Sequence, residues 1–185
     1  AAGAADRPDD VELLDVTRMC NGLVQTFAEY AETHKVGYRT EVGEGMLFPS
    51  ARGTLSMVLN IVLSNAFRRS ETGGEVFFGV SVVQDRLRVV VSNRGEGVDL
   101  GQIEFLSDRY RLLDYLESRG KGGLSQKGDM ELAICHNLAA KLGGEFRIAS
   151  EGDVTTVTLS FPELEIARVT QPVLQVDMAS DRQFG

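Results

Sequence analysis

Three stretches of the chain repeat apolar residues at helical spacing, and we therefore predict a helix for each of them. The first spans residues 11–34, with Asp10 placed to cap its N-terminus; its apolar positions are Leu13, Val16, Cys20, Leu23, Phe27 and Ala31. The second spans residues 55–69 and carries a broad apolar face. The third spans residues 130–142 and ends at two glycines, which suit the left-handed backbone that closes many helices.

Other stretches are short and alternate between apolar and polar positions, which predicts strands. They span residues 36–42, 75–83, 87–92, 145–149 and 154–161, and Pro162 would stop the last of them. Residues 84–86 would join the second and third strands in a tight turn.

Two stretches give no clear periodicity. Between the first strand and the second helix, Gly43, Gly45 and Pro49 predict a loop. Residues 95–128 are irregular, and we expect one short helix there, near residues 108–118.

This order of elements predicts an α+β fold. The expected architecture is a two-layer α/β sandwich, with helices on one face of a mixed, mainly antiparallel sheet. We expect the domain to span residues 11–162, after a linker at residues 1–10 and before an extension at residues 163–185.

Composition narrows the class of partner. The formal net charge is -8 and the sequence pI is about 4.8, so the surface repels nucleic-acid phosphates and anionic lipid. We therefore expect no nucleic-acid partner and no direct membrane contact. Cys20 and Cys135 both lie in apolar helical patterns, which indicates buried thiols in a reducing compartment, the cytoplasm. The alternative is the soluble, cytosolic part of a longer, membrane-anchored protein.

Three motifs in this order resemble the ATP-binding domain of sensor histidine kinases. Leu59 to Ser70 (LNIVLSNAFRRS) is similar to the N box of that family, and Val89 to Val98 (VVVSNRGEGV) is similar to its first glycine box. Leu132 to Ser150 (LAICHNLAAKLGGEFRIAS) is similar to the segment after its second glycine box. The gyrase, mismatch-repair and Hsp90 ATPases share this fold. The resemblance implies a histidine protein kinase that binds ATP and Mg²⁺.

The resemblance implies roles for residues of the N box. Asn65 matches the asparagine that coordinates Mg²⁺, an ion that prefers oxygen ligands; the alternative is a helix asparagine that faces solvent. Arg68 and Arg69 could pair with phosphate, or could simply be solvated at a helix C-terminus, where cations are favourable. Ile61 stands where the family has a polar residue, and Asn60 is one position away, on another side of the helix.

The first glycine box keeps two glycines but changes its acidic residue. Asn93 replaces the aspartate that accepts a hydrogen bond from the adenine amino group, so one carbonyl acceptor remains and the charge is lost. Gly95 and Gly97 match the glycines of the box, and a tight turn after a strand is the plainer explanation for both.

The second glycine box departs most from the family pattern. Alignment on Leu132 puts Lys127, Asp129 and Glu131 on the three glycine positions, with Gly128 between the first two. In the family these glycines let backbone amides approach the phosphates at a helix N-terminus. Here Asp129 and Glu131 would occupy the positive end of the helix and repel a triphosphate, while Lys127 could partly offset them.

Two functions follow as hypotheses. The chain is either an ATP-binding module that serves phosphotransfer to a histidine, with weak or lost nucleotide binding, or a degenerate module with a regulatory or protein-interaction role. The expected partners are a histidine-bearing dimerisation domain and a response regulator of a two-component system. The histidines of this chain, His34 and His136, do not fit the phosphoacceptor pattern, in which an acidic residue follows the histidine.

Overall fold

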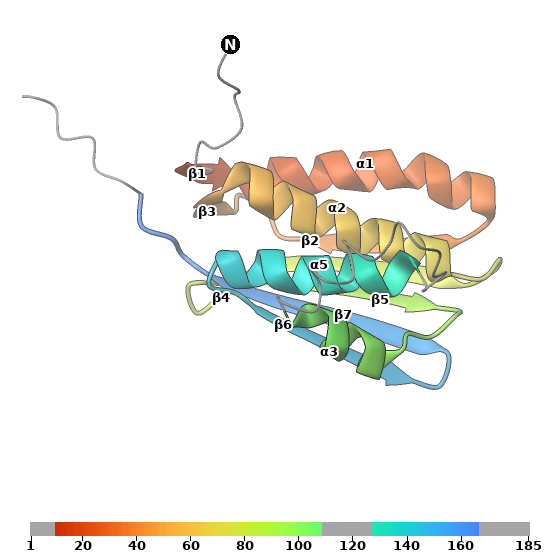
Figure 1. Cartoon of the computed structure of the whole chain (residues 1–185). Coiled ribbons are helices and arrows are strands. Elements are labelled where there is room, and N and C mark those ends of the chain that lie inside the picture. The colour runs from red at the N-terminus through yellow and green to blue at the C-terminus, as the bar shows by residue number, and fades with distance from the viewer. Residues whose placement is uncertain (1–9, 109–126, 167–185) are drawn as a thin grey trace, which may run out of the picture.

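A computed structural model describes residues 10–108 and 127–166. Their largest sheet has the strand order β2-β4-β5-β7-β6, and a smaller sheet pairs β1 with β3. The strands are β1 (Val11–Asp15), β2 (Gly37–Val42), β3 (Leu47–Ala51), β4 (Glu75–Val83), β5 (Arg86–Arg94), β6 (Glu145–Glu151) and β7 (Val154–Pro162). The helices are α1 (Val16–His34), α2 (Arg52–Arg69), α3 (Leu100–Ser107) and α5 (Lys127–Lys141) (Figure 1).

The sheet is mixed and mainly antiparallel, as the sequence predicted. β2 runs parallel to β4, whereas the β4–β5, β5–β7 and β6–β7 pairs are antiparallel. The β4–β5 hairpin turns at Gln84 and Asp85, which have φ angles of 50° and 57°. Two positive φ angles in a two-residue loop match the right-handed twist of the strands.

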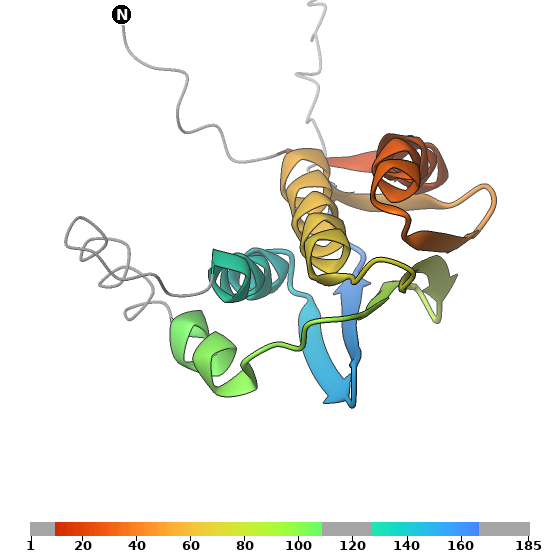
Figure 2. The ribbon, with the colours of Figure 1, turned by 90° about the vertical axis from the view of Figure 1, so that its right-hand side faces the viewer.

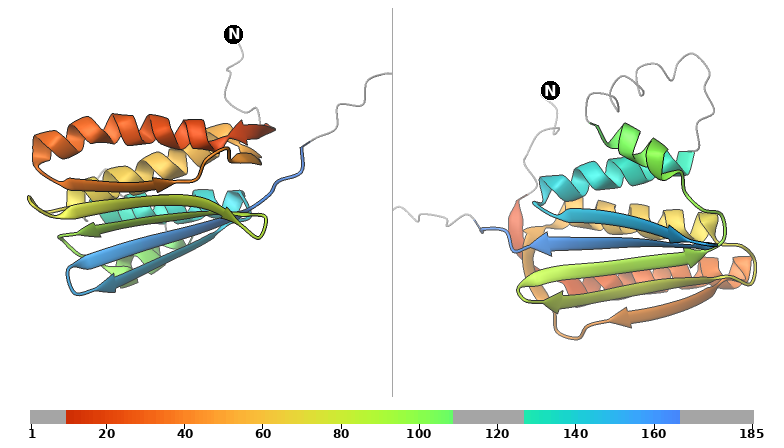
Figure 3. Two further views of the ribbon diagram at one scale, coloured as in Figure 1. Left: turned by 180° about the vertical axis from the view of Figure 1, so that it is seen from behind. Right: turned by 90° about the horizontal axis from the view of Figure 1, so that it is seen from below.

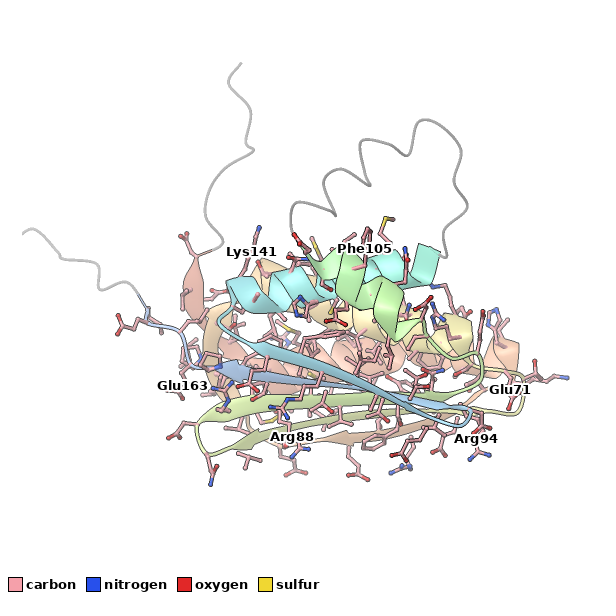
Figure 4. All side chains as sticks on the ribbon, turned by 60° about the horizontal axis from the view of Figure 1, so that its bottom comes forward. Glu71, Arg88, Arg94, Phe105, Lys141 and Glu163 are labelled. Atoms are coloured by element: carbon pink, nitrogen blue, oxygen red, sulfur yellow. The ribbon has the colours of Figure 1, made fainter. Side chains whose placement is uncertain are left out.

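The long helices cover one face of the sheet. An end-on view places α1, α2 and α5 side by side on that face, with α3 against α5 near β6 (Figure 2). Seen from behind and from below, the other face has no helix over it among the described residues (Figure 3). Arg88 and Arg94 of β5 are exposed (Figure 4). No helix in the described part of the chain is both long and apolar enough to span a bilayer.

The core forms between α2 and the central strands. Every second residue of β5 is buried, and the buried face of α2 packs over these strands. Phe67 of α2 stacks on Phe27 of α1, with ring centroids 5.2 Å apart, and meets the ring of Tyr38 edge to face. Cys20 and Cys135 are both buried and free, as predicted from their apolar contexts.

The first helix begins later than its periodicity predicted. Val11 to Asp15 forms β1 instead, and Asp15, not Asp10, caps α1 by accepting a hydrogen bond of 2.9 Å from the Arg18 amide. Leu13 is 55% exposed, so it does not belong to the buried stripe of the helix. The pattern misled because a five-residue strand that leads straight into a helix can continue the helical spacing by chance.

One expectation about an irregular region was also wrong. The segment expected to be a loop around Pro49 contains β3, where Pro49 pairs with Leu13 and its carbonyl accepts a bond from the Leu164 amide. Proline is tolerated there because this sheet has only two strands. Farther on, α3 spans Leu100–Ser107, ahead of the helix expected near residues 108–118, which falls almost entirely outside the described residues.

Candidate nucleotide-binding site

The C-terminal end of α2 meets the glycine loop that follows β5. Ser70 pairs with Gly95 in an isolated bridge, and the Glu96 amide donates to the Arg69 carbonyl at 2.9 Å. Gly95 has a φ of +152°, and a Cβ on it would collide with the Arg69 carbonyl. The N box and the first glycine box are therefore joined in space, and Gly95 is required for their contact.

The two glycines of this loop differ in their surroundings. A Cβ on Gly97 would meet only the Ser150 hydroxyl, at 3.7 Å, and Gly97 has no positive φ. Packing therefore does not require a glycine at position 97, whereas Gly95 is fixed by the close approach of α2.

Asn65 is buried on α2, with 4% of its surface exposed. The alternative of an asparagine that faces solvent is therefore wrong. Asn60 is exposed and its side chain donates to the Ser56 carbonyl, so it lies away from Asn65 as expected. Ile61 packs against the hydrophobic core. A buried amide on the helix that meets the glycine loop remains a suitable oxygen ligand for Mg²⁺.

Arg69 is also buried, with 7% of its surface exposed, and its guanidinium donates to the carbonyl of Gly97. The interpretation of a solvated helix end is therefore wrong for Arg69. Its side chain ties α2 to the glycine loop.

Arg68 pairs with Glu131 of α5. The two side chains are joined in a fork: Nη1 of Arg68 lies 3.1 Å from Oε1 of Glu131, and its Nη2 contacts Oε2. Their side chains are 39% and 23% exposed. A bidentate pair is the arrangement in which a guanidinium holds a carboxylate, or a phosphate, most specifically. The pair therefore bridges the N box and the altered second glycine box.

The sequence suggested that Glu131 lies at the positive end of its helix. The structure shows that it does not. The described part of α5 runs from Lys127, and Glu131 lies more than one turn after that residue. Because the effect of the helix dipole is confined to the first turn, Arg68 is the group that neutralises Glu131.

Asn93 and Thr155 face each other across the β5–β7 ladder. They are register partners and are only 4% and 3% exposed. Among the described residues, neither the Asn93 Nδ2 atom nor the Thr155 Oγ1 atom has a hydrogen-bond partner. Buried polar atoms usually have partners, so this pair marks a place where a further polar group fits.

The sequence did not identify Thr155 as a site residue, and it did not predict that Glu131 pairs with Arg68. The alternation of β7 would have placed Thr155 on the buried face with Val157 and Leu159. Only the strand register, however, puts it beside Asn93. The Arg68–Glu131 pair joins residues 63 positions apart and needed the packing of α2 on α5.

The buried thiols take no part in this chemistry. Burial raises the pKa of Cys20 and of Cys135 to about 12, so neither forms a thiolate nucleophile near neutral pH. The site instead offers the amide of Asn93 at the end of β5, the hydroxyl of Thr155 at the start of β7, a buried asparagine on α2, and a paired arginine. Amide and hydroxyl groups are of the kind that hydrogen-bond a base, and an amide oxygen is of the kind that Mg²⁺ prefers.

Known proteins with similar sequences are sensor kinases. The chain is 27% identical over 160 residues to the sensor-like histidine kinase SenX3 of Mycolicibacterium smegmatis. The aligned region covers 86% of this chain and 41% of SenX3. The chain spans less than half the length of SenX3.

Solved structures share the fold. The nucleotide-free catalytic domain of histidine kinase ThkA matches with a TM-score of 0.68 at 14% identity, over 83% of this chain and 98% of that domain. Full-length ShkA in complex with AMPPNP matches with a TM-score of 0.66 at 18% identity, over 89% of this chain and 34% of ShkA.

The family model that matches residues 51–165 spans both the N box and the glycine boxes. Its match covers the elements from the start of α2 to the end of β7, including every residue of the candidate site described above. The chain therefore belongs to the histidine kinase-, DNA gyrase B-, and HSP90-like ATPase family.

Proposed function

We propose that this chain is the ATP-binding domain of a two-component sensor histidine kinase and acts in the cytoplasm. The similarity to sensor kinases along 86% of the chain supports this function. The partners would be a histidine-bearing dimerisation domain and a response regulator; ThkA, which shares the fold, has been solved in complex with the response regulator protein TrrA. We further propose that residues 11–162 form the nucleotide-binding unit.

The described residues fit a nucleotide at one end of the site better than at the other. Asn93 and Thr155 would hold the base, because both carry buried polar atoms that lack partners. Asn65 would hold Mg²⁺ through its amide oxygen. Bound ATP would supply the phosphoryl group for transfer to a histidine on another domain.

At the end of the site where Arg68 would bind phosphate, an ion pair is already in place. This single observation supports weak binding of the nucleotide. Arg68 is the cation of the N box best suited to a phosphate, but both of its terminal nitrogens already contact the carboxylate of Glu131. A nucleotide would have to break this pair and then lie beside the freed carboxylate. Two like charges about 6 Å apart repel by roughly 2–3 kcal/mol at an effective dielectric constant of 20. We therefore expect a dissociation constant for Mg-ATP no better than about 1 mM.

Calorimetric titration of the chain with Mg²⁺ and AMPPNP tests this proposal. The Glu131→Gln variant keeps the shape of the side chain but removes its charge, and it should bind about 5- to 30-fold more tightly, which corresponds to roughly 1–2 kcal/mol. Glu41→Gln is the matched control, because Glu41 pairs with Arg39 on the edge strand β2, away from α2 and α5. Micromolar binding by the unaltered chain would contradict the proposed role of the ion pair.

A second candidate is a regulatory or protein-interaction module without ATP. The Arg68–Glu131 pair favours it, because this pair and the Arg69–Gly97 contact already give both arginines of the N box protein partners. In that case neither the unaltered chain nor Glu131→Gln would bind AMPPNP in the same titration.

A further inference from the structure

The pair formed by Asn93 and Thr155 has a hydrogen-bonding pattern that differs from that of a carboxylate. A carboxylate only accepts hydrogen bonds, whereas the amide of asparagine has both a donor and an acceptor, and the threonine hydroxyl can act as either. The two residues are adjacent in the ladder and lie on the buried face of the sheet. Their polar atoms Nδ2 and Oγ1 are buried and are not bonded to each other or to any other described residue.

The surroundings of the pair restrict what could satisfy these atoms. Val76, the other register neighbour of Asn93, is fully buried, and Val91 and Val157 lie one step along the same face. Apolar walls with one amide and one hydroxyl suit a flat, largely apolar ring that carries a hydrogen-bonding edge. The hollow that Asn93 lines also contains Glu75 and Arg94, one charge of each sign, so its net charge favours neither a donor nor an acceptor on that ring.

The amide of Asn93 can match two kinds of purine edge. In one orientation its oxygen accepts from a 6-amino group and its nitrogen donates to the ring nitrogen N1. After a 180° flip its nitrogen donates to a 6-oxo group and its oxygen accepts from the protonated N1. The flip exchanges two atoms of similar size, so it needs no change in packing.

We infer that the Asn93–Thr155 pair makes this pocket accept 6-oxopurines as well as 6-aminopurines. The inference rests on the proposed function, because it deepens the role of the same nucleotide site. Residue 93 determines specificity in this pocket: a carboxylate there would repel the 6-oxo group, whereas the amide binds either edge. The nucleotide class of the domain then includes guanine- and hypoxanthine-bearing ligands.

Nucleosides test the base end separately from the closed phosphate end. The full chain, labelled with ¹⁵N, is titrated with adenosine and with inosine, and dissociation constants are taken from the chemical shifts, including those of the Asn93 side-chain amide. The two constants should agree within about threefold for the unaltered chain. Asn93→Asp should then favour adenosine by about tenfold or more, because the carboxylate accepts from the amino group and repels the oxo group. Asn60→Asp makes the same chemical change at an exposed position and should leave the ratio unaltered.

The outcomes separate the inference from the proposed function. Adenosine binding at least about tenfold tighter than inosine binding by the unaltered chain would overturn the inference and leave the nucleotide-binding function in place. Shifts from neither nucleoside would overturn both, since the buried atoms would then have no base to satisfy them. The decisive ratio, that of the dissociation constants for adenosine and inosine, is measured on the unaltered chain. The test therefore stands even if Asn93→Asp does not fold.

Discussion

Gly95 lies where two segments distant in sequence come closest. Its φ of +152° and the nearby Arg69 carbonyl leave no room for a side chain. Gly97, two residues later, is exposed and has space for a Cβ. The glycine box therefore holds one glycine that the fold requires and one that packing does not, although both fit the same motif.

We expect Gly95→Ala to lower the free energy of unfolding by about 2–4 kcal/mol, because it combines backbone strain with a clash against α2. Gly97→Ala is the matched control and should change stability by less than about 1 kcal/mol. Urea denaturation followed by circular dichroism measures both. Equal losses in the two variants would contradict the distinction between the glycines.

The two cysteines couple stability to pH. Burial raises the pKa of each thiol from 9.0 to about 12, so the unfolded chain releases these protons at a lower pH than the folded chain does. Their contribution is therefore fully present below about pH 9 and is lost as the pH rises toward 12. Between pH 8 and pH 10 the free energy of unfolding should fall by about 1–3 kcal/mol from this cause.

The measurement is a set of denaturant titrations at several pH values. The double variant Cys20→Ala, Cys135→Ala should be less stable at pH 8 because it leaves small cavities, but its stability should fall less steeply toward pH 10. An unchanged slope would show that other groups control the alkaline limb.

Individual site residues could be predicted only in part. The match to the N box pointed to Asn65, and its burial on α2 agrees with a site role. The same motif left Arg68 and Arg69 equivalent, yet one pairs with Glu131 and the other with the Gly97 carbonyl. That difference depends on which helix face meets α5 and which meets the loop, and helical spacing alone does not determine it.

At the scale of elements, long periodic segments were predictable and short ones were not. The strands β4, β5, β6 and β7 and the helix α2 have enough alternating or helical positions for the pattern to identify them. By contrast, β1 and β3 have five residues each and depend on pairing with each other. α3 has eight residues and begins after the Asp99 cap, within a stretch that shows no clear periodicity.

The start of α1 gives a direct test of this correction. Asp15→Ala removes the side chain that accepts from the Arg18 amide, and it should destabilise the protein by about 0.5–2 kcal/mol. Asp10→Ala removes the residue that the periodicity favoured as the cap, and it should have an effect below about 0.5 kcal/mol. Chemical denaturation of the two variants decides between them, and a larger loss for Asp10→Ala would restore the longer helix.

At the scale of the whole molecule, the site joins elements from most of the chain. Asn65 and Arg68 come from α2, Asn93 and Gly95 from the end of β5 and the loop after it, Glu131 from α5, and Thr155 from β7. A ligand bound between them would contact both the helical layer and the sheet. Binding should therefore stabilise the whole domain against unfolding, in proportion to the logarithm of ligand concentration over the dissociation constant.

A variant that restores the family pattern uses this linkage as its readout. Asn93→Asp, combined with glycine at positions 127, 129 and 131, restores the charge of the acceptor for adenine and removes the partner of Arg68. Three glycines in α5 cost about 1 kcal/mol each, so the melting temperature without nucleotide should fall.

The informative quantity is therefore the shift in melting temperature that 10 mM Mg-AMPPNP causes. With a dissociation constant of about 1 mM, the unaltered chain gains about 1.4 kcal/mol, or roughly 3–6 °C. A variant that binds at about 10 µM gains about 4 kcal/mol, or roughly 8–16 °C. Equal shifts for both proteins would mean that these four positions do not limit nucleotide binding.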